Sequence, residues 1–468
     1  MRKLLEKLSA LQLLAIGLGL LALHLNFYAS PWTAWLCLFC YAPLIAWYVK
    51  FSKKSFRCGL VFGLFHSWFN MYWLGQFVGR WTSSVVIGAI VIVIVGMIWG
   101  TTYGAVFKLC SLFIKRFPIT QYPLIFVSLL LAETMRQALP QLAFPFTPIG
   151  ESLVTYPIWT AIVPGSLLTT TVVIGINTML APLLIGASAE HKSGDSLKPI
   201  IGIGAGLLVI VLYADIKQAI AKPHPTKNVR IALGQLGFDM AYGDPTIAAI
   251  QIKQTVERLI QKAKQQNADI LILPEAVAAF ASSPETSFRL PKDMNILFGA
   301  ARGNSPKFQS AYLWDGKSFQ HTDKNRLVVF GEYVPFRGLI PYPQDFKLPA
   351  GDLAPGQQRY TLKFNKDMTV GPMICFESLF DETSNDFKEQ NAGFLCVMSL
   401  DDWYMGTSAI PRLFTAARWR AVESQRWVGR VGSLGITAVI NPQGQIVKDL
   451  AVGQEDTLIF ELPLMSSK

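Results

Sequence analysis

The chain has 468 residues, of which 51% are hydrophobic and 16% are charged. This apolar excess, concentrated in about the first 215 residues, excludes an ordinary soluble protein and indicates membrane segments followed by a more polar part. The net charge of +11 is not carried by basic stretches interleaved with aromatic residues, so we expect no nucleic-acid partner.

The amino-terminal half contains about seven apolar segments, each close to the roughly 20 residues that cross a bilayer. Lysines and arginines gather in alternate connections, such as Lys53 with Lys54 and Lys115 with Arg116. The positive-inside rule makes these connections cytoplasmic, and an odd number of spans leaves everything after Ala214 on the opposite side. The expected spans are Leu11–Phe27, Trp32–Val49, Gly59–Phe77, Val85–Phe113, Tyr122–Leu139, Ile158–Ile185 and Pro199–Ala214.

Polar residues inside the expected spans allow two interpretations. Glu133 and Arg136 stand three residues apart, so they either face a partner or a wet cavity, or they neutralise each other as an i,i+3 pair. His66 and Asn70 either line a lipid pocket or anchor the span at the membrane interface.

The composition changes after Ala214, which predicts a membrane domain over residues 1–216, a linker over 217–228 and a second domain over 229–468. Short apolar runs alternate there with amphipathic helices, and this alternation indicates a layered α/β fold. The expected helices are Pro245–Gln266 and Ser408–Gln425, and the expected strands are Val229–Leu236, Asp269–Leu273, Asn295–Ala300, Gln309–Trp314, Lys317–His321, Tyr360–Phe364, Thr369–Ile374, Gly393–Ser399, Val428–Val431 and Ile436–Asn441.

The stretch Val370–Leu379, VGPMICFESL, brings Cys375 to the end of an apolar run. Strand ends in layered α/β folds open onto crevices, so a thiol in this position is a candidate nucleophile. A cysteine in an apolar run is also a common core residue, which is how we interpret Cys396 in FLCVMS. The six cysteines form no CxxC pattern with histidines, so we expect no metal.

A thiol nucleophile needs a base for its proton and a cation for the oxyanion of its intermediate. Glu275 follows a buried strand and a proline, where burial would raise its pKa toward that of a general base. Lys324 precedes an apolar turn that closes on Glu332, which could pair with the lysine or orient it. Each of these residues alone could instead form an ordinary surface ion pair.

Glu275 in LPEA, Lys324 in KNRLVVFGEYVPF and Cys375 in ICFE occur in that order, about 50 residues apart. They resemble the Glu-Lys-Cys triad of the nitrilase superfamily. Joined to an apolar amino-terminal half, they resemble the membrane-anchored branch of that superfamily, the bacterial apolipoprotein N-acyltransferases. DDWYMG, with Trp403, and Ala421-Val422-Glu423 add to the resemblance.

The resemblance implies a polytopic α-helical membrane domain in the bacterial inner membrane and a nitrilase-like α/β domain, an αββα sandwich, on the periplasmic side. It implies that the glutamate is the general base, the lysine stabilises the oxyanion and the cysteine is acylated. The residues matching Glu332 and Glu377 support the site, and Phe376, Trp403 and Tyr333 are substrate-binding candidates.

The implied reaction has two steps and uses no cofactor and no metal. The thiol of Cys375 takes an acyl chain from a membrane phospholipid, and the thioester then acylates the α-amino group of the diacylglyceryl-cysteine that begins an apolipoprotein. Two alternatives remain open: an amidase or divergent acyltransferase acting on another amine, and a non-catalytic lipid-binding protein.

Overall fold

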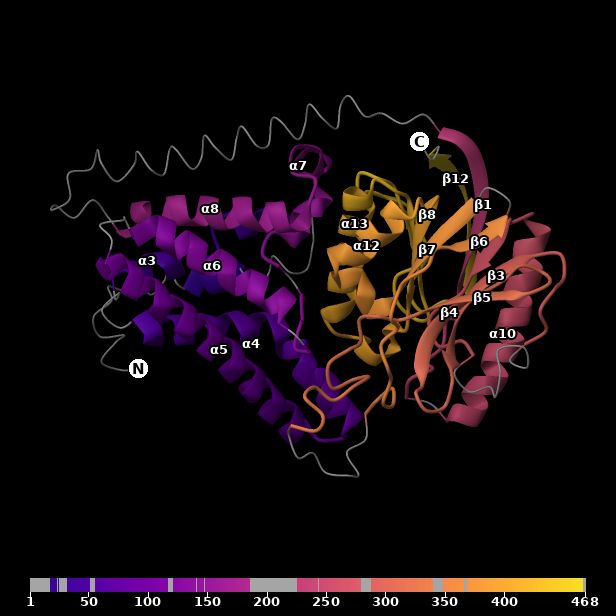
Figure 1. Cartoon of the computed structure of the whole chain (residues 1–468), viewed down its shortest axis with the longest axis horizontal. Coiled ribbons are helices and arrows are strands. Elements are labelled where there is room, and N and C mark those ends of the chain that lie inside the picture. Colours follow the sequence, from indigo (N-terminus) through magenta and orange to yellow (C-terminus); the bar gives the residue numbers. More distant parts are fainter. Residues whose placement is uncertain are drawn as a thin grey trace. The chain divides into compact units, whose positions relative to one another are not determined.

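The computed structural model describes residues 17–22, 24, 32–50, 55–116, 121–139, 141–146, 148–185, 225–242, 244–278, 288–339, 348–365 and 368–465. The chain divides into two compact units, one made mainly of helices and one built on sheets (Figure 1). The first unit comprises Met1–Leu139 and Thr147–Ile220, and the second comprises Pro140–Phe146 and Ala221–Lys468. The expected spans at 11–27 and 199–214 and most of the linker lie largely or wholly outside the described residues.

All the regular secondary structure described in the first unit is helical. Its elements are η1 (Ala34–Leu38), α3 (Ala42–Lys50), α4 (Ser55–Trp81), α5 (Val85–Arg116), α6 (Gln121–Ala138), η3 (Glu151–Thr155), α7 (Pro157–Ile162) and α8 (Ser166–Ile185). Within the described residues, two helical stretches, Val85–Phe113 and Ser166–Leu184, are long and apolar enough to cross a membrane.

Two expected spans are wrong as single helices. The span 158–185 breaks between α7 and α8, because Pro164 lacks a backbone N–H and disfavours helical backbone at the residue before it. The span 32–49 breaks between η1 and α3. At this break the side chain of Asn177, in α8, binds two backbone N–H groups. Its Oδ1 accepts hydrogen bonds from the N–H groups of Tyr41 and Ala42, at 2.7 and 3.0 Å.

The i,i+3 pair, one of the two interpretations left open for Glu133 and Arg136, is present, and it belongs to a larger polar cluster. Arg136 Nη2 lies 2.6 Å from Glu133 Oε2, and both side chains are fully buried. The Tyr103 hydroxyl donates to Glu133 Oε1 at 2.6 Å. His66 and Asn70 are also buried and bond to each other, so interfacial anchoring was wrong for them. His66 Nε2 lies 3.7 Å from Glu133 Oε1, so buried polar contacts join α4, α5 and α6.

The second unit contains two six-stranded sheets. The first has the order β12-β1-β2-β3-β4-β5, from β1 (Pro225–Gln235), β2 (Ile270–Ile272), β3 (Asn295–Arg302), β4 (Phe308–Trp314), β5 (Phe319–Asp323) and β12 (Asp456–Met465). The second has the order β11-β10-β9-β8-β7-β6, from β6 (Leu362–Asn365), β7 (Met368–Ile374), β8 (Phe394–Ser399), β9 (Val428–Gly432), β10 (Ala438–Ile440) and β11 (Ile446–Asp449).

Alternating side chains build four layers. Ile231 and Leu233 of β1 point into a core shared with Ile374 and Met398 of the other sheet, whereas Ala232 belongs to the opposite face. Helix α10 (Pro245–Gln265) covers that outer face, and α12 (Asp381–Glu389) and α13 (Ala409–Ser424) cover the outer face of the second sheet (Figure 1). The layers are therefore helix, sheet, sheet and helix, as expected.

Strand direction brings the functional segments to one edge. Strands β1, β2 and β3 are parallel, and β7, β8 and β9 are parallel in the other sheet. Strand β5 runs in the direction of β3, because both pair antiparallel with β4. The residues that follow β2, β5, β7 and β8 thus emerge at the carboxyl ends of their strands, where such sheets open.

Candidate active site

Cys375 follows β7 directly and begins a short 3-10 helix, η4 (Cys375–Leu379). Its backbone has a φ of +50°, in the left-handed region that residues with a Cβ adopt rarely. The side chain is 6% exposed. Strain of this kind persists only where the surroundings enforce it, and it is common at functional sites.

Lys324 follows β5 and is 1% exposed. Its Nζ lies 3.0 Å from Glu275 Oε1 and 2.6 Å from Glu332 Oε1. Burial by itself would lower the pKa of Lys324, but the two carboxylates outweigh it and raise that pKa well above its ordinary value. The ammonium is therefore charged, and two of its three protons are directed at carboxylates.

Glu275 comes two residues after Leu273, beyond the end of β2, and is 6% exposed. Its Oε1 binds Lys324, and its Oε2 accepts a hydrogen bond from the N–H of Leu400 at 3.3 Å. These contacts fix both oxygens between the segments that follow β5 and β8. The expectation that Glu275 and Lys324 converge across 49 residues is confirmed by the geometry.

The surroundings of Cys375 keep its thiol protonated. Burial raises the pKa of this thiol most, and the charge of Glu275 raises it further. The charge of Lys324 and a hydrogen bond from Ser399 lower it only in part. The sulfur therefore needs a base at the moment of attack, and Glu275 is a carboxylate whose charge acts on it.

Glu332 and Glu377 hold the site in two different ways. Glu332 binds Lys324 with Oε1 and accepts from the N–H of Val328 with Oε2, at 2.9 Å. Burial raises the pKa of Glu332, Lys324 lowers it and Glu275 raises it again, with a net rise. Glu377 accepts from the N–H of Ile374 at 2.9 Å and of Asn325 at 2.8 Å, so it ties the cysteine turn to the lysine loop.

The end of β8 and the short helix after it bring three unexpected residues to the site, namely Ser399, Asp401 and Tyr404. The Ser399 hydroxyl lies 3.4 Å from Cys375 Sγ and 2.7 Å from Asp401 Oδ1. Asp401 is fully buried and accepts from Arg430 Nη2 at 2.8 Å. Tyr404 is buried, and burial and the charges of the site raise its pKa well above the ordinary value. The signal that could have indicated these residues is their position: β8 is the parallel neighbour of β7, so the residues that follow the two strands emerge side by side.

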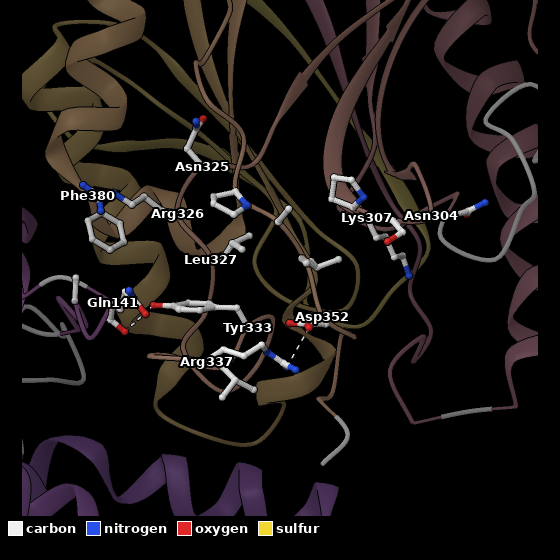
Figure 2. A pocket seen from close by; sticks show the side chains of 17 residues that line it. Gln141, Asn304, Lys307, Asn325, Arg326, Leu327, Tyr333, Arg337, Asp352 and Phe380 are labelled. Carbon is white, nitrogen blue, oxygen red and sulfur yellow. Dashed lines mark hydrogen bonds and ion pairs between the residues drawn. The ribbon is translucent and has the colours of Figure 1, made fainter. Parts of the chain in front are cut away.

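The three substrate-binding candidates lie in different surroundings. Phe376 is buried in an aromatic cluster, with ring centroids 5.4 Å from Phe380 and 5.8 Å from Phe144. Trp403 packs against Tyr242 with centroids 5.4 Å apart. Tyr333 lines a cavity of about 630 Å³, and its hydroxyl donates to the carbonyl of Gln141 at 2.7 Å (Figure 2).

One further sequence expectation concerns a second cysteine of this unit. Cys396 is fully buried in the core between the sheets, as expected.

Comparisons with known proteins agree on one family. A model of the apolipoprotein N-acyltransferase N-terminal domain matches residues 19–179, and a carbon-nitrogen hydrolase model matches 313–467, which includes Lys324 and Cys375. The apolipoprotein N-acyltransferase of Geobacter metallireducens is 26% identical over 485 residues, covering 97% of this chain and 89% of the relative. That of Rhodopseudomonas palustris is 26% identical over 500 residues, with 98% and 90% covered.

Among solved structures, Saccharomyces cerevisiae Nit3, a member of branch 10 of the nitrilase superfamily, is 18% identical. The match covers 51% of this chain and 91% of that chain, with a TM-score of 0.39. One family model matches within each half of the sequence, and relatives of one name match it over nearly its whole length. The chain therefore resembles the apolipoprotein N-acyltransferases in both of its parts.

Proposed function

We propose that this protein transfers an acyl chain from a membrane phospholipid, through a thioester on Cys375, to the α-amino group of the diacylglyceryl-cysteine of apolipoproteins. The observation that carries the proposal is the convergence of Glu275, Lys324 and Cys375 at one edge of the paired sheets, in a chain that resembles this family.

In the first half-reaction Glu275 accepts the thiol proton as Cys375 Sγ attacks the ester carbonyl at the sn-1 position. The raised pKa of the thiol supports attack with simultaneous proton transfer rather than a standing thiolate. The tetrahedral intermediate collapses with loss of the glycerol oxygen, which takes the proton from Glu275. A lysophospholipid leaves and a thioester remains.

Lys324 stabilises the negative oxygen of that intermediate. Two carboxylates hold its ammonium in place before the reaction, so no reorganisation is needed when the charge develops. Its third N–H is directed at neither carboxylate and can donate to the oxyanion. Glu332 thus contributes by positioning Lys324, and Glu377 by fixing the loop that carries it.

In the second half-reaction the α-amino group attacks the thioester carbonyl. Glu275 accepts a proton from the nitrogen, and the sulfur leaves as the intermediate collapses. The sulfur recovers the proton from Glu275, so the product is an amide and the free enzyme is restored. The same base and the same oxyanion donor serve both steps.

The proposal includes a location. Residues 1–216 form a multi-pass domain in the bacterial inner membrane, residues 217–228 a linker, and residues 229–468 the catalytic domain on the periplasmic side. Two apolar helices, the basic connections between spans and the match to the N-terminal domain of this family support it. Both substrates are lipids, so the catalytic domain has to work at a membrane surface.

The test is a complete reaction with purified full-length protein. Phosphatidylethanolamine and a synthetic peptide beginning with diacylglyceryl-cysteine are supplied, and the peptide mass is followed. We expect an increase of one acyl chain on the α-amine, lost in Cys375→Ala and kept in Cys396→Ala, which removes the core thiol.

A peptide whose α-amine is blocked by acetylation is expected to gain nothing. Release of free fatty acid without any acylated peptide would contradict the proposal, because it would identify a hydrolase. Full transfer by Cys375→Ala would contradict the proposal as well, because this variant cannot form a thioester at residue 375.

A further inference from the structure

The sheet unit also contains a cavity that the proposed mechanism does not use. The cavity of about 630 Å³ is walled by segments 304–307, 325–327, 333–337 and 352–355, among others. Three cations line it, namely Lys307, Arg326 and Arg337, against one carboxylate, that of Asp352 (Figure 2). A cavity of this size accommodates a small ligand, and its charges favour an anionic one.

Chain neighbours of the catalytic residues line the cavity. Arg326 is two residues from Lys324, so their Cα atoms are at most about 7 Å apart. Tyr333 follows Glu332 directly. The Phe380 ring, also in the wall, packs 5.4 Å from that of Phe376, the residue after the nucleophile. The lining of the cavity is thus continuous along the chain with the segments that carry Lys324, Glu332 and Cys375.

The three cations differ in how firmly they are held. Arg326 is paired with Glu382, and its Cζ lies 4.9 Å from the centroid of the Phe380 ring. Arg337 forms an ion pair with Asp352, drawn as a dashed line in Figure 2. The distance from Arg337 Nη2 to Asp352 Oδ2 is 3.0 Å, but both side chains are more than half exposed. Among the described residues, no carboxylate lies within ion-pair distance of Lys307. An anion that enters the cavity can therefore bind Lys307 without displacing a carboxylate, and it can compete with Asp352 for Arg337.

Phosphate is the anion that suits this set. Arginine presents a planar fork that matches phosphate oxygens, and lysine adds a point charge. Leu339, two residues after Arg337, is 83% exposed on the same segment. Cations beside an exposed apolar side chain are typical of a protein surface that meets lipid headgroups.

We propose that this cavity binds the phosphodiester headgroup of the acyl donor, with Lys307 and Arg337 as its principal ligands. The inference rests on the proposed function. In a glycerophospholipid only the glycerol unit separates the phosphate from the sn-1 ester. Phosphate held beside Lys307 and Arg337 thereby directs the ester toward Cys375. The enzyme accordingly prefers acyl donors that carry a phosphate over acyl esters that lack one.

The test compares two donors with the full-length protein and follows the acyl adduct on Cys375 by intact mass. One donor is phosphatidylethanolamine, and the other is p-nitrophenyl palmitate, which has no phosphate. In the double variant Lys307→Ala/Arg337→Ala we expect efficiency with the phospholipid to fall about tenfold or more beyond any fall with p-nitrophenyl palmitate. Lys317→Ala, an exposed lysine outside the cavity, is expected to leave the ratio of the two efficiencies unchanged.

The outcomes separate this inference from the function on which it rests. If neither donor acylates Cys375 in the unaltered protein, the proposed function fails and the inference with it. If both donors acylate Cys375 and the double variant loses the same fraction of its efficiency with each donor, only the headgroup site is wrong. Excess inorganic phosphate is expected to slow the phospholipid reaction selectively, and equal slowing of both reactions would contradict a headgroup site.

Discussion

The hydroxyl of Ser399 lies 3.4 Å from the sulfur of Cys375. The same oxygen is 2.7 Å from Asp401 Oδ1, and Asp401 is held by Arg430. A serine hydroxyl has one proton, so it is shared between the carboxylate and the sulfur. As negative charge grows on the sulfur, the proton can turn toward it and lower the pKa of the thiol.

Removing this hydroxyl should make Cys375 less reactive. Ser399→Ala is expected to slow alkylation of Cys375 by iodoacetamide about tenfold at a given pH, because a hydrogen bond to a charged group is lost. Peptide mass analysis after timed alkylation measures the rate. Ser384→Ala, a buried serine bonded to the Asp381 carbonyl, serves as control. Equal rates in the two variants would show that Ser399 does not act on the sulfur.

Glu275→Gln tests the general base. Loss of the base is expected to slow thioester formation by about 10²- to 10⁴-fold near pH 7. The variant also removes a charge that raises the Cys375 pKa, yet burial keeps that pKa above the ordinary value. The thiolate fraction therefore grows with pH, and the variant's rate should rise about tenfold per unit between about pH 7 and 9. A rate that stays flat over this range would argue against a role for Glu275 in proton removal.

Glu377→Gln tests the tie between the cysteine turn and the lysine loop. The amide keeps one acceptor oxygen, so it can serve the N–H of Ile374 or that of Asn325 but not both. We expect thioester formation to slow about ten- to a hundredfold while its pH profile keeps its shape. Glu389→Gln, an exposed residue that ends α12, is the control. A Glu377→Gln enzyme of full activity would show that this tie is dispensable.

Asp402 should make stability depend on pH. Burial raises the pKa of this carboxyl from 3.8 to about 7, although hydrogen bonds from Ser433 and the N–H of Met240 lower it in part. The folded protein thus binds a proton that the unfolded chain releases at lower pH. The resulting stability is complete below about pH 4 and is lost as pH rises through about 7.

The variant Asp402→Asn removes that titration. Thermal unfolding at pH 5 and pH 8 should show a larger fall in Tm for the unaltered protein than for the variant, with a limit of about 1.4 kcal/mol per pH unit. An equal fall in both proteins would mean that Asp402 is charged in the folded state at pH 5.

Much of the sheet unit was predictable from the sequence, because buried strands leave continuous apolar runs and α10 repeats its apolar residues at helical spacing. Two of the elements that were missed lack such a signal. Strand β11 is exposed along its length, and α12 is a polar helix that buries few side chains, Phe387 among them. Strand β12 was missed although Leu458, Leu462 and Leu464 of this strand lie in the core between the sheets. The break before α8 was missed because apolar content continues through Pro164 and Gly165.

The site was predictable in part, for a different reason. Glu275 and Cys375 each stand at the end of an apolar run, which marks the carboxyl edge of a strand, whereas Lys324 follows the polar strand FQHTD and was indicated only by the apolar turn after it. Ser399 and Asp401 stand at such an end as well, but a serine and an aspartate in a loop are common without a role in chemistry. Only the pairing of β7 with β8 shows that Ser399 reaches the sulfur.

The most direct test of the account is the mass of the intact protein after exposure to phosphatidylethanolamine alone. Without an acceptor the first half-reaction should stop at the thioester, so the account predicts a gain of one acyl chain, removable by hydroxylamine and located on Cys375. The Cys375→Ala variant should gain nothing. An unchanged mass, or an acyl adduct that persists in Cys375→Ala, would contradict thioester formation at this site.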